Sequence, residues 1–187
     1  QANQIKVGSF SRSERLIKWN QCLRIGEKLK NPYLMLSNKR FSTLHVTCHL
    51  SLKDAIETIN KNKLLEVIRI GYEHMLKIGY KNPKIGICGL NPHSGENGMF
   101  GDEEIKFFLP AINILKKEGI NISNPISADI IFRQAISGKY DLIIANYHDQ
   151  GHIPVKLLYF DQSVNVTLGV PIIRTSVDHG TAFDLAF

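Results

Sequence analysis

Three histidines of this chain each follow an apolar run that is typical of a buried strand, and they are His49, His93 and His148. Ligands of open α/β sheets collect beyond the carboxyl ends of the strands. The three imidazoles could therefore converge on one divalent cation and leave open positions for a substrate. Any one of them alone would more often be an ordinary loop or core histidine. Their shared placement favours the hypothesis of a metal site.

Charged and amide side chains follow the third of these histidines. Asp149 could orient the His148 imidazole, contact the metal or accept a proton. Lys156, Asn165 and Arg174 come next along the chain. A lysine and an arginine near a metal would suit a phosphorylated substrate. The alternative for each of these side chains, taken alone, is a surface position.

The segment 89–101 is rich in glycine and follows the second predicted strand. Such a loop can bring backbone N–H groups close to a ligand. It matches neither a Walker nor a Rossmann phosphate motif, and the alternative is a long polar turn.

Of the remaining histidines, His45 is a lone strand residue, and His152 lies four residues after His148. We expect the intervening Gly151 to disfavour a helical ligand pair.

Alternating strands and helices must position these groups. Ser51 and Asp54 have the spacing of a capping box, which begins a helix, and the next helix ends near Gly79. Pro110 could kink a third helix. The predicted elements are strands at 44–49, 84–90, 141–147, 164–168 and 172–175, and helices from 51, over 63–77 and over 103–118. This alternation predicts an α/β protein with a largely parallel core sheet.

Composition narrows the class of protein. The 187 residues are 43% hydrophobic, which suits one globular domain or parts of two. No apolar run reaches membrane-spanning length, so we expect no membrane partner. The cysteines, which are Cys22, Cys48 and Cys88, have no paired spacing, so we expect a reduced, cytoplasmic protein with small buried thiols. The net charge of +6 is scattered without a dense basic run, which disfavours a nucleic-acid partner.

Several unusual motifs recur together in this chain. The most specific is Gly89-Leu-Asn-Pro-His-Ser-Gly-Glu96, followed by Phe100-Gly-Asp-Glu-Glu104. The others are Thr47-Cys-His-Leu50, Ser127-Ala-Asp129, Tyr147-His-Asp-Gln-Gly151, Val164-Asn-Val-Thr-Leu-Gly169 and Pro171-Ile-Ile-Arg-Thr-Ser-Val-Asp-His-Gly-Thr181. In their order and spacing they resemble the 4-hydroxythreonine-4-phosphate dehydrogenase (PdxA) family. The resemblance covers residues 32–187.

The resemblance implies an isocitrate/isopropylmalate dehydrogenase-like α/β fold, truncated here, and a homodimer with active sites shared between subunits. It also implies NAD-dependent oxidation and decarboxylation of 4-phosphohydroxy-L-threonine to 3-amino-2-oxopropyl phosphate in pyridoxal phosphate (vitamin B6) biosynthesis. The divalent metal would be zinc, magnesium or cobalt. We expect an N-terminal remnant over residues 1–40 and the catalytic and metal-binding portion over residues 41–187.

The resemblance also assigns roles to single residues. Metal binding falls to the three strand-end histidines, His49, His93 and His148. Substrate contacts fall to the polar residues after them, Lys156, Asn165 and Arg174. The candidates for proton transfer are Asp149, Asp129 and Lys156.

A segment near the end of the chain, containing His179, Gly180, Thr181 and Asp184, resembles the adenosine-side loop of related decarboxylating dehydrogenases. A strand-to-helix junction there would offer backbone N–H groups to the NAD cofactor. The alternative for this segment is an ordinary helix cap.

The chain also departs from the family pattern. We find no Pro-Gly-Asp-Pro start, no Gly-Pro-x-x-Lys segment and no Gly-His-Thr-Glu motif, the last of which normally supplies substrate contacts. His152 stands where an apolar residue is usual. Two alternatives therefore stay open. One is a catalytically inactive remnant that still binds metal, and the other is a metal-dependent hydrolase of phosphorylated substrates.

Overall fold

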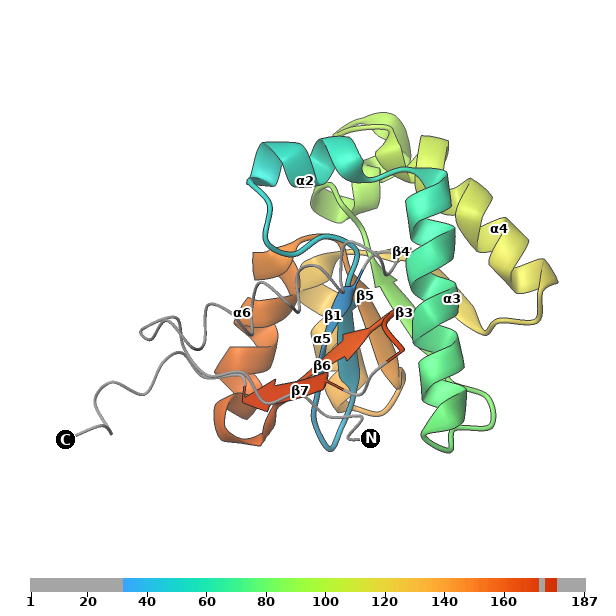
Figure 1. The fold of residues 1–187 in the computed structure, drawn as a ribbon. Helices are drawn as coiled ribbons and strands as arrows, with labels where there is room; N and C mark the ends of the chain where they lie inside the picture. The colour runs from blue at the N-terminus through green and yellow to red at the C-terminus, as the bar shows by residue number, and fades with distance from the viewer. Residues whose placement is uncertain (1–31, 172–173, 178–187) are drawn as a thin grey trace.

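One β-sheet organises the part of the chain that the structure, a computed structural model, describes, namely residues 32–171 and 174–177. Its seven strands lie in the order β4-β3-β5-β2-β1-β6-β7 (Figure 1). The strands are β1 (Tyr33–Ser37), β2 (Ser42–His45), β3 (Ile85–Cys88), β4 (Ile122–Ile126), β5 (Leu142–Ala145), β6 (Val164–Leu168) and β7 (Arg174–Val177).

Pairing direction divides the sheet into two halves. The strands β4, β3, β5 and β2 are parallel, while β1, β6 and β7 are joined to the sheet by antiparallel pairs. Every residue of β2, β3 and β5 is buried, as expected of parallel strands covered on both faces. The parallel core predicted from the sequence is confirmed. Because β1 pairs with β2, the sheet extends across the predicted boundary at residue 40.

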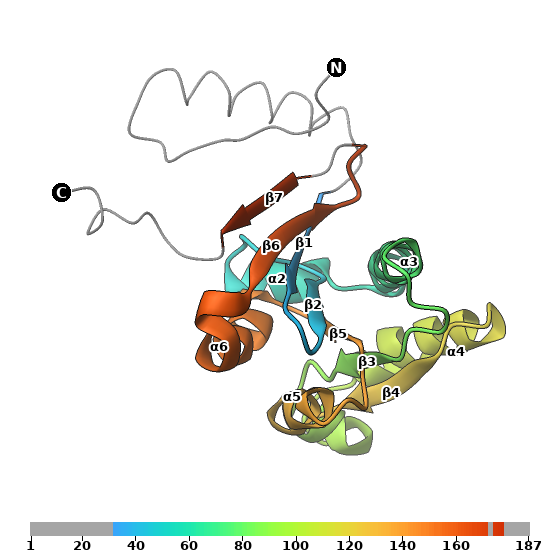
Figure 2. The same cartoon turned by 90° about the horizontal axis from the view of Figure 1, so that it is seen from below.

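Helices cover both faces of the sheet. On one face lie α3 (Lys61–Lys77) and α4 (Leu109–Lys117), and on the other lie α5 (Ala128–Ile136) and α6 (His148–Tyr159) (Figure 2). The shorter elements are α2 (Leu52–Thr58), the 3-10 turns η1 (Pro92–Gly98) and η3 (Phe160–Gln162), and the π turn η2 (Glu104–Phe108). Within the described ranges, no helix is both long and apolar enough to span a bilayer.

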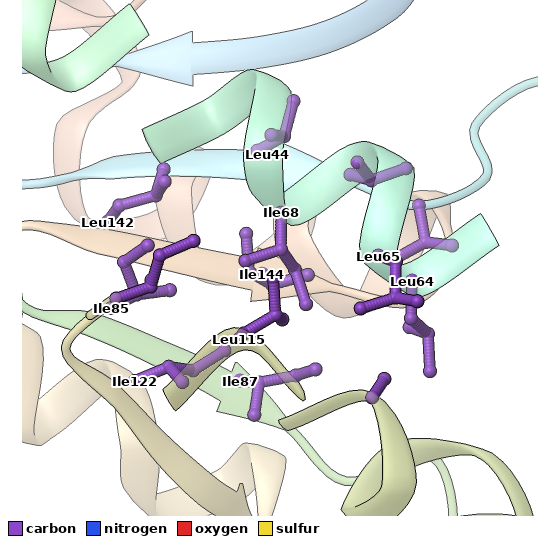
Figure 3. Close-up of a cluster of buried hydrophobic side chains, with 14 of the residues drawn as sticks. Leu44, Leu64, Leu65, Ile68, Ile85, Ile87, Leu115, Ile122, Leu142 and Ile144 are labelled. Carbon is purple, nitrogen blue, oxygen red and sulfur yellow. The ribbon is translucent and has the colours of Figure 1, made fainter. Parts of the chain in front are cut away.

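Strand side chains alternate between two hydrophobic cores. Ile144 of β5 joins the cluster under α3 and α4, whereas its neighbour Ile143 joins the cluster under α5 and α6. Figure 3 shows the first cluster, in which Ile68 of α3 and Leu115 of α4 meet the strand residues. Burying each such side chain contributes about 1.5–3 kcal/mol to folding, so the two cores fix which helix lies on which face.

The predicted helices are found with shifted ends. Ser51 caps α2 as predicted, because its Oγ accepts a hydrogen bond from the Asp54 N–H and donates one to the Asp54 carboxylate. The helix predicted over 103–118 is a π turn, η2, followed by α4. The change occurs beside Pro110 in the first turn of α4, where the missing proline N–H cannot continue the α-helical hydrogen bonds.

Local signals do not predict β1, β4, α5 or α6. The strand β4 contains Pro125, close to a shift of its register with β3. The helix α6 contains both Gly151 and Pro154. These residues normally interrupt strands and helices, and here packing against the sheet overrides them.

The helix α6 passes very close to the end of β2, and Gly151 makes this approach possible. A Cβ atom at Gly151 would lie 2.3 Å from His45 Nε2 and 2.9 Å from Thr43 Cγ2. Gly151 does not interrupt the helix, because His148 and His152 both lie on α6, but His152 is not in the group of possible metal ligands that contains His148. The glycine lets the helix backbone rest on the strand instead of ending the helix.

His45, at the end of β2, is a buried titratable group with 1% of its surface exposed. Its Nδ1 lies 3.1 Å from the carbonyl oxygen of Leu34. A carbonyl can only accept, so Nδ1 carries the proton, and Nε2 has no hydrogen-bond partner among the described residues. Burial, and to a smaller degree the neighbouring His152, lowers the pKa of His45 from 6.5 to about 3.

We predict that this burial makes stability depend on pH. As pH falls from about 6.5 towards the folded pKa of about 3, the unfolded chain binds a proton that folded His45 does not. Stability from this group is therefore complete above the unfolded pKa and falls by up to about 1.4 kcal/mol per pH unit below it. Urea denaturation measures the free energy of unfolding at pH 7 and at pH 5. Between these two pH values it should fall by about 2 kcal/mol more in wild type than in His45→Leu. Equal losses in the two proteins would contradict the prediction.

The close approach of α6 gives a second prediction. The substitution Gly151→Ala inserts a methyl group against His45 and Thr43, so the free energy of unfolding should fall by about 1–3 kcal/mol. Ile130→Ala on α5 is the control, because Ile130 is 49% exposed and should change stability by only about 0.5 kcal/mol. Chemical denaturation measures both. A Gly151→Ala protein as stable as the control would show that α6 does not lie this close to β2 in solution.

Candidate metal centre

The carboxyl ends of three neighbouring parallel strands meet at one edge of the sheet. The strands β3, β5 and β2 are adjacent and parallel there. The segments that leave them carry His93, His148 and His49, respectively, and His148 is the first residue of α6. The predicted placement of the three histidines beyond strand ends is therefore confirmed, although β2 ends at His45 rather than at Cys48.

Cys48, His49 and His148 form a compact group of possible metal ligands. Each offers one ligand atom, and these atoms all lie within 4.8 Å of one another. The ring centroids of His49 and His148 are 5.8 Å apart. Two nitrogens and one sulfur suit zinc or cobalt(II) better than magnesium, which prefers oxygen ligands. These residues therefore fit a divalent transition metal. Cys48 was predicted only as a buried thiol; it is half-buried in the structure, and this burial raises its pKa to about 11.

His93 does not belong to this group. Its side chain is exposed, and its ring centroid lies 5.9 Å from that of Phe100. His93 also begins a run of left-handed backbone, with φ of 51°, that continues to Asn97 with φ of 55°. Left-handed backbone is costly for residues other than glycine. The loop therefore needs support from outside itself.

The carboxylate of Glu104 supplies that support. Glu104 is 3% exposed, and its Oε1 accepts hydrogen bonds from the backbone N–H groups of Leu90 at 2.8 Å and Asn91 at 2.9 Å. Its Oε2 accepts from the Asn91 side-chain amide at 2.9 Å. A Cβ atom at Gly95 would lie 2.8 Å from Oε2, so the glycine lets the loop close over the carboxylate. Sequence reasoning assigns Glu104 no role, although the residue lies in one of the quoted motifs.

Asp149 orients the His148 imidazole. The distance from His148 Nδ1 to Asp149 Oδ1 is 2.7 Å. The carboxylate accepts this hydrogen bond, so Nδ1 carries the proton and Nε2 keeps its lone pair for a metal. Of the roles considered for Asp149, orientation of the imidazole is the one that this contact supports.

Four imidazoles form a row from the core to the surface, which we call the histidine row. The rings of His148 and His152 are stacked, with centroids 3.8 Å apart and planes 7° apart. The His152 ring lies 4.5 Å from that of His45, and His49 lies on the outer side of His148. Burial, followed by the adjacent His148, lowers the pKa of His152 to about 4. The two inner rings, His45 and His152, are therefore uncharged at neutral pH.

The predicted substrate contacts lie on separate elements. Lys156 follows His148 on α6 by two turns, roughly 12 Å along the helix axis. Asn165 lies on β6, and its Oδ1 is buried without a hydrogen-bond partner in the described part of the chain. Arg174 lies on β7 and donates from Nη1 to Thr167 Oγ1 at 2.9 Å. The strand β7 is three strands away from β2 in the sheet, a distance of roughly 14 Å. A single chain therefore does not bring all three predicted substrate contacts next to Cys48, His49 and His148.

The structure describes the position of Asp129 but not that of the residues predicted to bind NAD. Asp129 lies exposed in the first turn of α5, which follows β4 at the same edge of the sheet. The residues predicted to bind NAD, namely His179, Gly180, Thr181 and Asp184, lie outside the described residues.

A pocket of ≈ 180 Å³ opens beside Cys48. Tyr33 of β1, His45 of β2 and Lys63 of α3 contribute to its lining. The Lys63 ammonium donates a hydrogen bond to the Tyr33 hydroxyl at 2.9 Å, and burial lowers the pKa of Lys63. The pocket therefore places a cation near the proposed metal group. No sequence motif pointed to Lys63.

Comparison with known proteins shows the family of the chain. The family model described as "Pyridoxal phosphate biosynthetic protein PdxA" matches residues 20–187. The chain is 50% identical over 153 residues to 4-hydroxythreonine-4-phosphate dehydrogenase from Geobacter metallireducens, covering 82% of this chain and 45% of that protein. It is 44% identical over 154 residues to D-threonate 4-phosphate dehydrogenase from Pectobacterium atrosepticum, covering 82% of this chain and 47% of that protein.

A solved structure shows the same fold. The 4-hydroxythreonine-4-phosphate dehydrogenase from Klebsiella pneumoniae is 38% identical to this chain, with a TM-score of 0.82 over 93% of this chain and 55% of that one. The chain spans about half the length of the curated relatives it matches. Its fold is the isocitrate/isopropylmalate dehydrogenase-like fold that the motifs implied. By its family match, its motifs and its strand-end histidines, the chain belongs to the PdxA family.

Proposed function

We propose that this chain is the metal-binding half of an NAD-dependent dehydrogenase that acts on a small 4-phosphorylated hydroxy acid. The observation that carries the proposal is the compact group of Cys48, His49 and His148 at the carboxyl edge of the sheet in a PdxA-family chain. In the proposed reaction the C3 hydroxyl of the substrate is oxidised to a ketone. The resulting β-keto acid then loses its carboxylate as CO2.

Zinc or cobalt is the metal that the donor atoms favour. His49 and His148 would hold it, with His148 binding through Nε2 because Asp149 engages Nδ1. The bound cation would polarise the substrate hydroxyl and later the ketone, while NAD accepts the hydride. The other tasks, namely binding the phosphate and moving protons, fall to residues of the protein.

The sequence and the structure point to different residues for the third ligand. The motif resemblance names His93, whereas Cys48 is the residue that lies beside His49 and His148. We propose that Cys48 fills the third position within one chain. His93 would complete the site only in the homodimer with shared active sites that the resemblance implies.

Exposed apolar side chains on α6 and η3 support this homodimer. Ile153, Leu157 and Phe160 have exposed fractions of 61%, 82% and 52%. Ile153 and Leu157 lie one helical turn apart on α6, and exposed apolar surface of this kind is typical of protein interfaces. The proposed interface would lie beside the histidine row, because Ile153 follows His152 directly on α6.

Cations and amides of the chain suit the rest of the substrate. Lys156 and Arg174 would bind the phosphate, and the buried Oδ1 of Asn165 would accept a hydrogen bond from a substrate hydroxyl or ammonium. Asp129 and Lys156 are the candidates for proton transfer in this proposal. Asp149 would fix the tautomer of His148, as its short contact with that ring supports.

Two substrates fit this chemistry. 4-Phosphohydroxy-L-threonine would give 3-amino-2-oxopropyl phosphate, and D-threonate 4-phosphate would give the corresponding hydroxy ketone phosphate. They differ at C2, which carries an ammonium in the first and a hydroxyl in the second. Relatives named for each substrate are 50% and 44% identical to this chain, so both belong in the test.

Cobalt binding tests the ligand assignment. We predict that the chain binds Co(II) with a sulfur-to-cobalt charge-transfer absorption, and that Cys48→Ser loses it while keeping the weaker visible bands. His148→Ala should raise the Kd by more than about tenfold, since it removes a ligand and not merely its support. His74→Leu, on α3, is the matched control. If Cys48→Ser leaves the spectrum unchanged and His93→Ala alters the visible bands, then His93 holds the third position.

Turnover tests the reaction. With Zn(II) or Co(II), we expect NADH formation from at least one of the two substrates, with a rate at least about 100-fold lower in His148→Ala. The ratio of kcat/KM for the two substrates identifies the preferred C2 substituent. If a folded dimer binds metal but forms no NADH, the chain is an inactive metal-binding remnant. If it releases phosphate without NAD, the chain is a hydrolase.

A further inference from the structure

We propose that His152, supported by His45, is a positioning residue that holds the His148 imidazole in the plane required for metal binding. This inference rests on the proposed role of His148 as a metal ligand and extends it to two buried residues that do not reach the metal group themselves. The histidine row would then be the inner support of the metal centre.

The His148 side chain needs support because it is 40% exposed. A surface imidazole on the first turn of a helix can rotate about both of its side-chain torsions. Asp149 fixes only the direction of Nδ1, because one hydrogen bond at 2.7 Å still allows the ring to turn about that contact. A second constraint is needed to fix the ring plane.

His152 supplies that second constraint. Its ring lies 3.8 Å from the His148 ring with only 7° between the planes, so a rotation of His148 out of this plane would drive its edge into His152. Together, the stacked face and the Asp149 contact determine where His148 Nε2 points. A metal ligand fixed in this way binds without first losing rotational freedom.

His152 can act as a support because it is itself held. Its Nδ1 lies 3.1 Å from the His148 carbonyl oxygen, one helical turn earlier, and donates to that oxygen. Behind it lies His45, 4.5 Å away, which is anchored in turn by Nδ1 on the Leu34 carbonyl. Gly151 leaves room for this second ring, since a Cβ atom there would overlap His45 Nε2.

Four variants test the proposal through Zn(II) and Co(II) binding. His152→Leu removes the flat ring and should raise the Kd by about tenfold and broaden the visible Co(II) bands. His152→Phe keeps a flat ring without the Nδ1 donor and should recover affinity to within about threefold of wild type. His45→Leu should weaken binding less than His152→Leu does. The control is again His74→Leu, which should leave the Kd unchanged. Thermal unfolding of the metal-free proteins checks that each variant is folded.

A metal-independent measurement separates this proposal from the proposed function. In the metal-free protein, NMR relaxation of the imidazole carbon–hydrogen groups should show an ordered His148 ring in wild type and His152→Phe, and a ring with larger-amplitude rotation in His152→Leu. If wild type binds no metal, the proposed metal function fails, and the NMR result still decides whether His152 orders His148. If His152→Leu matches wild type in both Kd and NMR signal, the positioning role is overturned.

Discussion

The parallel pairing of β2 with β5 is the constraint on which the proposed metal centre depends. Its register sets Ser42 opposite Leu142 and His45 opposite Ala145, so the two strands end at the same level. The segments that follow them therefore begin side by side and bring His49 and His148 together. Side chains alternate along a strand, so a slip of one residue would turn His45 away from α6 and into the opposite core.

Sequence patterns predict the parts of this centre that depend on strand ends. His49 and His148 each follow an apolar run, and the structure places their rings 5.8 Å apart. The position of Cys48 beside these two histidines could not be predicted in this way, because the apolar run extends to Cys48 whereas β2 ends at His45. The contact between His152 and His45 was also beyond prediction. It depends on how close α6 comes to the sheet, which packing determines and local propensity does not.

His93 lies in the most specific motif but outside the group formed by Cys48, His49 and His148. The motif places His93 after β3, but the loop that carries it adopts left-handed backbone at His93, Ser94, Glu96 and Asn97. That conformation depends on Glu104, which lies outside the loop and holds its start through hydrogen bonds to Leu90 and Asn91. No helical or strand periodicity encodes such a contact.

The last strand on the parallel side of the sheet has a consequence for how copies of the protein meet. In the described residues β4 is the terminal strand, and it carries Pro125 beside a shift of register. A proline has no N–H to offer, so an approaching foreign strand meets an interrupted row of donors and acceptors. The β4 edge therefore disfavours pairing with strands of other copies of the chain, which is the process by which exposed sheet edges form fibrils. Association through helices and loops is then the route that the sheet leaves open at this end.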